Sequence, residues 1–478
     1  MGVSQRITIA EAKTRQRSLD FAEEFRHQFL LAKDPALIPK AWRRLELAGW
    51  HLGFGAAMPV HDILDAQGKP IGFLLGVAWN AAGTLQQRVA RIPKTNQSTD
   101  IAATFENFAL RLGGRYVALL LTEGDARLYG DPSSDLSWVY DSDLRAVGST
   151  VSVLGSYPLN PNPEFRLRSL VNGYAVAAFE HTIDARIKRG RANHYLDLNT
   201  FELRRFWPNS EFALVSNEAE IDEACRKIAE KQARILRSLT AAFPCILPVT
   251  GGHDSRVLLA CGTRFLGDFV EFCGYRFHNP SKRDTRLGSE LVRGLGQDYE
   301  FYFTHGTTIG SLRDFRLRNG WACQRAELAA LNCLEQYAQD HLVLRGGVVE
   351  MLRANQWRSD RLDRPPLARY GLKRLRLRDG DPDAIKTRWE PEFNAWLETL
   401  PEPAQHRSYD FMHVELWLPH TLGAYYQGFN RNFFMNPYND RELIGWTASI
   451  PPTFRKTQNA VRKVIRAASP DVPVEVFT

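Results

Sequence analysis

The residues best suited to chemistry form a turn near the middle of the chain, Thr250–Ser255, with the sequence TGGHDS. An apolar run at 247–249 precedes it, and an amphipathic run at 257–266 follows it. This order predicts a strand, a tight turn and a helix. Because Gly251 and Gly252 carry no Cβ, the backbone N–H groups of the turn could close around a phosphate at the positive end of the helix. We interpret the turn as a pyrophosphate cradle.

The side chains of the turn add the other groups that a nucleotide site needs. Thr250 and Ser255 supply hydroxyl donors, and Asp254 supplies a carboxylate that could hold Mg²⁺ against the polyphosphate of ATP. The alternative for Asp254 is simply a cap for the following helix. His253 is expected to have no chemical role.

The turn resembles the S/T-G-G-x-D-S loop of the ATP pyrophosphatases, or PP-loop family. That family includes asparagine synthetase, GMP synthetase, argininosuccinate synthetase and several tRNA-modifying enzymes. The resemblance implies cleavage of ATP between its α- and β-phosphates, with ATP and Mg²⁺ as cofactors. A Walker A loop would instead carry Gly-Lys-Ser/Thr and hold a γ-phosphate for transfer.

A second glycine-containing turn, at 346–350, falls where asparagine synthetases carry S-G-x-G-x-D-E. The resemblance implies that Gly346 lies in the nucleotide site and that Glu350 is the second carboxylate on Mg²⁺. Glutamate keeps the hard oxygen ligand and lengthens its reach by one methylene. The alternative is an ion pair between Glu350 and Arg353. Gly347 replaces an acidic residue of asparagine synthetase, so asparagine itself is not supported as the product.

Two basic residues near the C-terminus are the catalytic candidates. Residues 436–443 and 448–451 resemble the family's V-P-F-L-D-x-x-L and A-x-x-[IL]-P segments. This register places Arg462 where the family has a lysine that touches the departing pyrophosphate, and Lys463 is the competing candidate. A guanidinium fork would then replace a point charge. The alternative for either residue is a solvated helix face.

The first half of the chain resembles the glutaminase domain of asparagine synthetases. The resemblance rests on residues 114–119, 128–132 and 193–198. A working domain of this type begins with a cysteine after the removed methionine, and its thiolate attacks glutamine. Here Gly2 follows the first methionine, and the first cysteine is Cys225. We therefore expect a structural domain without glutaminase activity.

Hydrophobic periodicity predicts the elements of this half. Residues 18–33 have helical spacing, and Glu123-Gly124-Asp125 is typical of a hairpin turn. Short strands beside a helix indicate an α+β domain. The predicted strands are 59–63, 70–79, 115–121, 126–129, 138–140 and 144–151.

In the second half, strands alternate with helices, which predicts a parallel, doubly wound sheet that binds ligands at the carboxyl ends of its strands. Asn217 with Glu220 resembles a capping box for a helix that runs to Thr240. Pro248 is expected to be tolerated only where strand pairing already stops. The other predicted elements are strands at 269–274, 299–304 and 341–345, a helix at 285–295 and a helical region at 309–339.

A chain of 478 residues is too long for one core. With a boundary at 208–216, we predict two domains. Residues 1–210 form a degenerate glutaminase-like domain, an α+β sandwich of the Ntn-hydrolase type. Residues 211–478 form an α/β domain like that of asparagine synthetase, a PP-loop synthetase with a doubly wound parallel sheet.

Composition narrows the class of protein. With 44% hydrophobic and 24% charged residues the chain is typical of globular proteins. No apolar run is long enough for a membrane span and no signal peptide is recognised, so we expect a cytoplasmic protein. The six cysteines lack C-x-x-C spacing, which argues against zinc and disulfides and favours burial. The net charge of +7 suits polyphosphate or another anionic ligand, nucleic acid included.

These patterns lead to an ATP-dependent amide-forming ligase as the expected function. It would adenylate a small-molecule or nucleotide-linked carboxylate, release pyrophosphate, and transfer the acyl group to an amine or ammonia. Relatives on this scaffold include β-lactam synthetases, lasso-peptide cyclases and amidating enzymes of polysaccharide biosynthesis. The basic run at 353–378 is either a solvated surface or the border of a pocket for an anionic acid.

Two other functions stay open. A tRNA-modifying PP-loop enzyme fits the pI of about 9.0, although the chain has neither a C-x-x-C pair nor a recognisable RNA module, so nucleic acid is not the expected partner. A catalytically degenerate nucleotide-binding scaffold fits the departures at Gly2, Gly347 and Arg462. The assembly state is open, and a homodimer is compatible with the sequence.

Overall fold

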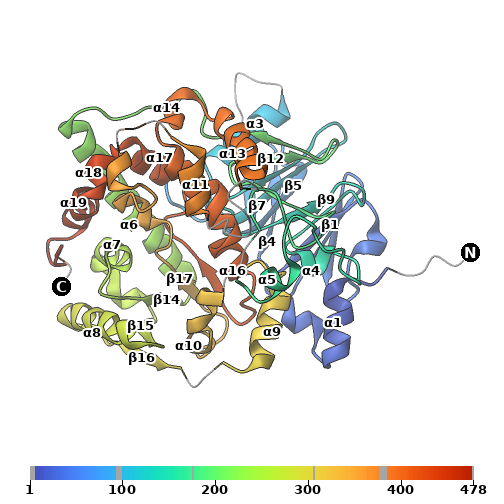
Figure 1. Cartoon of the computed structure of the whole chain (residues 1–478), viewed down its shortest axis with the longest axis horizontal. Helices are drawn as coiled ribbons and strands as arrows, with labels where there is room; N and C mark the ends of the chain where they lie inside the picture. The colour runs from blue at the N-terminus through green and yellow to red at the C-terminus, as the bar shows by residue number, and fades with distance from the viewer. Residues whose placement is uncertain are drawn as a thin grey trace, which may run out of the picture.

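The computed structural model describes residues 6–92, 100–174, 177–304, 307–323, 325–362, 364, 366–375 and 385–475. It is a mixed α/β protein built on three β-sheets (Figure 1). Two sheets belong to the described residues up to Arg205, called here the first half, and one belongs to the residues from Glu218 onward, the second half. No helix among the described residues has the length and hydropathy needed to span a bilayer.

The six-stranded sheet of the first half is antiparallel at every pair of neighbours. Its order is β11 (Lys188–Arg189), β9 (Val139–Asp141), β10 (Ala146–Gly148), β1 (Phe29–Ala32), β3 (Trp50–Phe54) and β2 (Arg43–Leu47).

The seven-stranded sheet is antiparallel apart from one parallel pair at its edge. Leu75 and Leu119 of this sheet share a hydrophobic core with Leu31 and Leu52 of the six-stranded sheet, so the two sheets pack against each other. The strand order is β13 (Glu202–Arg205), β12 (His194–Asp197), β8 (Ala126–Gly130), β7 (Gly113–Leu121), β5 (Pro70–Trp79), β4 (Val60–Leu64) and β6 (Val89–Arg91). The helices of this half are α1 (Ile9–Arg17), α2 (Phe21–Glu24), α3 (Ile101–Leu110), α4 (Val151–Leu154) and α5 (Leu167–Val171).

The sheet of the second half has five strands, and all of its neighbouring pairs are parallel. Its order is β16 (Glu300–Phe303), β15 (Glu271–Arg276), β14 (Cys245–Pro248), β17 (Leu342–Leu344) and β18 (Phe433–Met435). The chain therefore builds outward from β14 in one direction and then in the other. In such sheets ligands bind in the crevice beyond the carboxyl ends of the two strands between which the strand order reverses, here β14 and β17.

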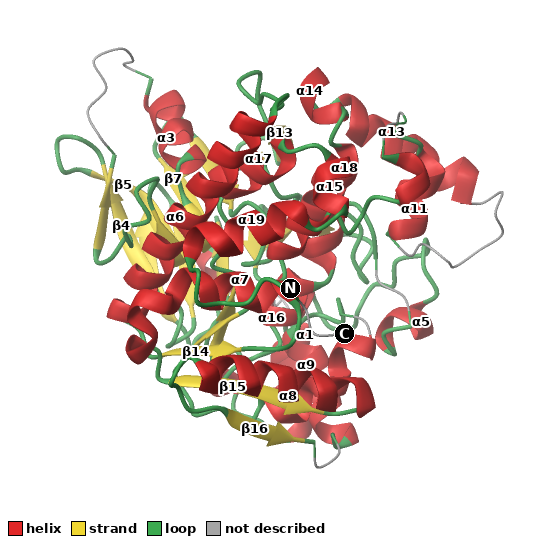
Figure 2. Ribbon diagram, turned by 90° about the vertical axis from the view of Figure 1, so that its left-hand side faces the viewer, coloured by secondary structure: helices red, strands yellow, loops and turns green. Residues whose placement is uncertain are grey.

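Helices cover both faces of this sheet (Figure 2). Leu247 and Leu344 pack in one core with residues of α6, α7 and α19, whereas Ile246 and Val343 pack in another with residues of α9, α10 and α16. The helices are α6 (Glu218–Ala242), α7 (His253–Gly262), α8 (Asn279–Gly294), α9 (Ile309–Arg318), α10 (Leu331–Leu334), α11 (Ala368–Arg374), α13 (Glu390–Glu398), α14 (Glu402–Gln405), α15 (Ser408–Met412), α16 (Leu422–Tyr426), α17 (Arg441–Ser449), α18 (Pro452–Lys456) and α19 (Asn459–Ala468). Shorter 3₁₀ and π segments are η1 (Pro35–Leu37), η2 (Thr263–Asp268), η3 (Arg325–Ala330), η4 (Val349–Arg353), η5 (Ser359–Arg361), η6 (Ile385–Trp389), η7 (His413–Trp417) and η8 (Leu418–His420).

Most predicted strands are confirmed, but the helix predicted at 18–33 is wrong. Only Phe21–Glu24 is helical there, and Phe29–Ala32 forms β1 in the middle of a sheet. Pairing of β1 with strands on both sides outweighs the local helical spacing. The helical region predicted at 309–339 is interrupted after α9, where Gly320 has a left-handed φ of 66°.

Two finer predictions have clear outcomes. Asn217 caps α6 by accepting the Glu220 N–H at 2.9 Å, but the Glu220 carboxylate bonds Ser216 and so does not complete a capping box. Pro248 is the last residue of β14, and pairing resumes with the Val249 N–H, which donates to Cys273 at 2.9 Å. The six cysteines are buried, as expected.

The two halves meet through buried polar groups rather than an apolar face alone. Arg441, at the start of α17, donates to the carbonyl of Ala109 at 3.0 Å, to Tyr116 Oη at 2.8 Å and to the carbonyl of Gly130 at 2.8 Å. Its guanidinium therefore lies inside the first half. The predicted boundary at 208–216 falls between β13 and α6.

Two buried histidines make stability depend on pH. Burial, with nearby arginines, lowers the pKa of His27 and of His420 to about 3. In the unfolded chain the histidine pKa is about 6.5, so below this pH the unfolded chain binds protons that the folded protein does not bind. Stability therefore falls as the pH falls below about 6.5. Between pH 7 and pH 5 we expect each histidine to lower the free energy of unfolding by about 2 kcal/mol. Urea unfolding at both pH values should show a shallower pH dependence for His27→Gln, and an unchanged dependence would contradict this.

Candidate functional site

The predicted cradle lies at the carboxyl end of β14, where α7 begins. Gly252 is the N-cap residue and provides no side-chain cap. The N–H groups of the first turn, which includes Asp254 and Ser255, therefore lack an acceptor inside the helix. Together with the helix dipole, these groups make the start of α7 suitable for an anion.

The amides that precede the helix are bonded to the protein. Thr250 N–H donates to Ser255 Oγ at 3.0 Å, Gly251 N–H to the Asp284 carbonyl at 2.9 Å, and Gly252 N–H to Thr250 Oγ1 at 3.3 Å. The hydroxyls of Thr250 and Ser255 thus hold the turn together. In this conformation only the helix amides and nearby cations could bind a phosphate. The sequence predicts that the N–H groups of the whole turn close around it, and the structure does not show this arrangement.

The turn after β17 touches the turn after β14. A Cβ added at Gly346 would lie 3.1 Å from the Cβ of Asp254, so a larger residue here would crowd the start of α7. At Gly347 a Cβ would lie 2.1 Å from Leu422 Cδ1. Any side chain at this position would require Leu422 to move.

Arg353 of η4 holds Asp254 through two hydrogen bonds, Nε to Oδ1 at 3.0 Å and Nη2 to Oδ2 at 2.6 Å. Such bidentate pairs fix both partners. Burial, together with the negative charge of Glu350, raises the pKa of Asp254 despite the arginine. Both carboxylates are therefore near enough to repel each other, which a cation between them would relieve.

Glu350 does not pair with Arg353, which was the alternative drawn from the sequence. Its Oε1 lies 2.9 Å from His413 Nε2, and its Oε2 accepts from Asn355 at 3.0 Å. Burial opposes ionisation, but these two partners lower the pKa of Glu350 overall. The carboxylate is thus kept charged beside Asp254.

The carboxylates of Asp254 and Glu350 could hold Mg²⁺ only under certain conditions. Among the described residues no three histidine, cysteine, aspartate or glutamate side chains gather as a metal site. Mg²⁺, however, is commonly held by one or two carboxylates together with substrate phosphates and waters. Asp254 and Glu350 can therefore hold it only with phosphate oxygens, and only when Arg353 releases Asp254.

The two catalytic candidates on α19 point in different directions. Arg462, with Arg256 and Arg353, adds to burial in lowering the pKa of His253 to about 4, so its charge acts at the start of α7. Lys463 Nζ lies 2.5 Å from Asp222 and 3.6 Å from Glu218, both of α6. Of the two, only Arg462 is brought to the candidate site.

The C-terminal segment lies across the start of α7. The buried Arg256 donates to the carbonyls of Pro473 at 2.8 Å and Gly251 at 3.0 Å, and also to that of Glu475. The Glu475 carboxylate accepts from Arg462 Nη2 at 3.1 Å. The Glu475 carboxylate therefore binds Arg462, the arginine that a bound phosphate would contact.

A pocket of about 630 Å³ opens beside Glu350. Its cations, Arg358, Lys373 and Arg374, come from the basic run at 353–378, so the described part of that run does border a pocket. This Glu350 pocket is lined by Glu350, Asn355, Gln356, Arg358, Tyr370, Lys373, Arg374 and Trp417.

Lys456 is a further cation that sequence reasoning missed. Its Nζ donates to the carbonyl of Ala354 at 3.4 Å, and burial together with the charges of Arg374 and Arg353 lowers its pKa. Its charge therefore acts near Arg374 of the Glu350 pocket and near Arg353, the partner of Asp254. No spacing in the sequence distinguishes Lys456 from an exposed lysine, because the fold alone brings α18 to η4.

No protein-family model matches the chain, and none of the curated proteins matches it either. The class of protein is therefore defined by the fold and the site. The chain is a mixed α/β protein whose five-stranded parallel sheet carries, at the ends of its central strands, two acidic side chains surrounded by arginines and a lysine.

Proposed function

We propose that this protein is an ATP- and Mg²⁺-dependent ligase that adenylates a substrate carboxylate and transfers the acyl group to an amine or ammonia. The observation that carries the proposal is the contact of Asp254 with Gly346 at the start of α7, beyond the ends of β14 and β17, where the strand order of the parallel sheet reverses. Under this proposal the second half is a PP-loop synthetase domain. The first half is a glutaminase-like domain, and Gly2, from which the sequence predicts the loss of the nucleophile, lies outside the described residues.

The side chains suggest how the reaction proceeds. The first-turn amides of α7 and Arg462 bind the outer phosphates of ATP, and Asp254 with Glu350 would hold Mg²⁺, which neutralises pyrophosphate as a leaving group. An oxygen of the substrate carboxylate attacks the α-phosphorus, and the bond to the bridging oxygen of the β-phosphate breaks. The amine then attacks the acyl carbon and AMP leaves. The protein contributes alignment and electrostatic stabilisation.

Exchange of labelled pyrophosphate into ATP tests the proposal directly, because it requires reversible formation of an acyl-adenylate. A panel of carboxylates is offered with ATP, with and without Mg²⁺. We expect exchange with at least one acid, only when Mg²⁺ is present. ATP binding without exchange for any acid would contradict the ligase.

Under this proposal the Glu350 pocket is the substrate pocket, and it is expected to select an anionic acid. Lys373→Met or Arg374→Met should raise the KM for the preferred acid by about 10- to 100-fold, since a charge-assisted hydrogen bond is worth about 1.5–3 kcal/mol. The kcat should change little, because neither side chain contacts the reacting phosphorus in this proposal. Lys227→Met on α6 is the control. A loss of kcat at unchanged KM would contradict the assignment.

A nucleotide-binding scaffold without turnover is the second candidate. It is favoured by the Asp254–Arg353 pair, which occupies a metal ligand, and by the Gly251 N–H, which is bonded to Asp284. In this case ATP binds, and Arg353→Met does not create or increase exchange. For the ligase, by contrast, ATP and Mg²⁺ must displace Arg353 from Asp254.

A further inference from the structure

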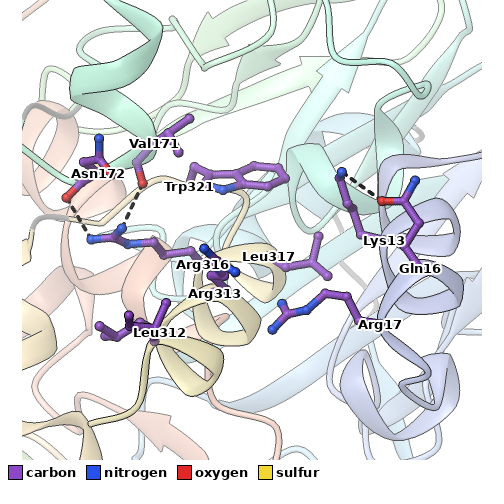
Figure 3. A pocket seen from close by; sticks show the side chains of 11 residues that line it. Lys13, Gln16, Arg17, Val171, Asn172, Leu312, Arg313, Arg316, Leu317 and Trp321 are labelled. Atoms are coloured by element: carbon purple, nitrogen blue, oxygen red, sulfur yellow. Dashed lines mark hydrogen bonds between the residues drawn. The ribbon is translucent and has the colours of Figure 1, made fainter.

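A second pocket, of about 620 Å³, lies where α1 of the first half meets α9 of the second, beside the end of α5 (Figure 3). It shares no lining residue with the Glu350 pocket. Four cations and no carboxylate are among the residues that line it. This basic pocket is lined by Lys13, Gln16, Arg17, Val171, Asn172, Ile309, Leu312, Arg313, Arg316, Leu317 and Trp321.

Two of the four cations are engaged in holding the halves together. Arg17 forms an ion pair with Asp314 and also donates to the carbonyl of Gly310 at 3.2 Å. Arg316 donates to the carbonyls of Val171 at 3.0 Å and Asn172 at 2.8 Å, as Figure 3 shows. These bonds fix the walls of the basic pocket.

The other two cations keep their charge available. Lys13 donates to the neutral Gln16 side chain at 3.0 Å, and Arg313 is exposed on α9. Neither forms an ion pair with an acidic side chain among the residues that the structure describes. The basic pocket therefore has uncompensated positive charge at its mouth, where an anion can approach.

The apolar wall is built around Trp321. The backbone N–H of Trp321 donates to the carbonyl of Arg316 at 2.9 Å, and the backbone N–H of Gly320 donates to the carbonyl of Leu317 at 3.3 Å. These two bonds form a Schellman cap on α9. Trp321 itself has a left-handed φ of 58°, a conformation that costs a residue with a side chain about 1–2 kcal/mol. The chain thus accepts strain that places a large aromatic ring between Arg316 and Lys13 (Figure 3). Such strain is found at ligand sites more often than elsewhere.

Exposed large side chains with apolar surface lie in or close to the elements that line the pocket. Ile309 and Tyr174 are each 69% exposed, and Tyr157 is 44% exposed with Lys13 Nζ 5.1 Å from its ring centroid. Ile309 lines the pocket, and Tyr174 follows Asn172 by two residues. Exposed apolar side chains gathered beside cations mark a binding surface.

We propose that the basic pocket binds an amphipathic organic anion. Its anionic group meets Lys13 and Arg313, and its aromatic or aliphatic body packs against Trp321 and Leu312. Because α1 and α9 come from different halves, the ligand bridges them and stabilises the folded chain. This site is separate from the proposed ATP site.

The test uses two fluorescent probes that differ in one group. 8-Anilinonaphthalene-1-sulfonate carries an anion, and N-phenyl-1-naphthylamine is its neutral counterpart. We expect the whole protein to bind the sulfonate at one saturable site, and we expect Arg313→Glu or Lys13→Glu to weaken that binding by about tenfold or more. Binding of the neutral probe should change little. The sulfonate should also raise the thermal midpoint of the wild-type protein more than that of either variant.

Arg237→Glu provides the control, since it makes the same charge change at an exposed position on α6. Asp254→Ala and saturating ATP with Mg²⁺ should leave sulfonate binding unchanged, which separates this site from the proposed function. Absence of saturable sulfonate binding would overturn the proposal. So would equal affinity in the two pocket variants and the wild type, or an equal loss for both probes.

Discussion

Asp254→Ala is expected to lower carboxylate-dependent exchange of pyrophosphate into ATP by about 10²–10³-fold, the range seen when one electrostatic contact to a transition state is removed. The variant loses the carboxylate at the start of α7 that would hold Mg²⁺, and Arg353 loses its bidentate partner. ATP affinity should fall far less, because the released arginine can meet a phosphate.

Asp268→Asn is the matched control, because this exposed aspartate lies in η2, beyond the far end of α7. It should retain wild-type exchange. Circular dichroism of both variants excludes unfolding as the cause. Exchange by Asp254→Ala at the wild-type rate would refute both the metal site and the ligase assignment.

Asp410→Ala is expected to reduce the free energy of unfolding by about 3–5 kcal/mol, as is usual when one member of a buried ion pair is removed. Arg455 donates to Asp410 through Nη1 at 2.8 Å and Nη2 at 2.6 Å, and both side chains are almost fully buried. Without Asp410 the guanidinium is left charged inside the protein. Trp357 Nε1, which donates to Asp410 at 3.0 Å, also loses its acceptor.

Urea unfolding monitored by tryptophan fluorescence measures this loss. Glu290→Ala, in an exposed pair with Arg286 on α8, should leave the unfolding midpoint unchanged. The effect also reaches the candidate site, because Arg455 donates to the carbonyl of Met351 at 2.7 Å in the turn that carries Glu350. A stable Asp410→Ala variant would show that this pair is not essential to the core.

The parallel sheet could be predicted from the sequence because its strands are short apolar runs separated by turns and amphipathic helices. The same reasoning failed for β1, whose residues have helical spacing but pair with residues at least 19 positions away in the chain. Local periodicity contains no information on such pairing, and tertiary contacts decide.

The candidate site shows a similar division. The positions of Asp254, Gly346 and Glu350 follow from the rule that parallel strands end at one edge, and the structure does bring their turns together. The partners could not be predicted. From the sequence, Arg353 is the alternative partner of Glu350, but in the structure it pairs with Asp254. Whether Arg462 or Lys463 faces the site depends on the rotation of α19 about its axis, which cannot be predicted from the sequence.

The insertion of Arg441 into the first half has a practical consequence for dissecting this protein. Cutting the chain anywhere in 208–216 and separating the pieces would leave Arg441 of one fragment without its hydrogen-bond acceptors. The carbonyls of Ala109 and Gly130 in the other fragment would lose their donor. Outside the first half the guanidinium would meet water, whereas the first half would keep buried acceptors without their donor, and both fragments would expose faces that are buried in the intact chain. Fragments expressed separately should therefore be insoluble, and co-expression should restore a soluble complex only if the guanidinium regains its acceptors.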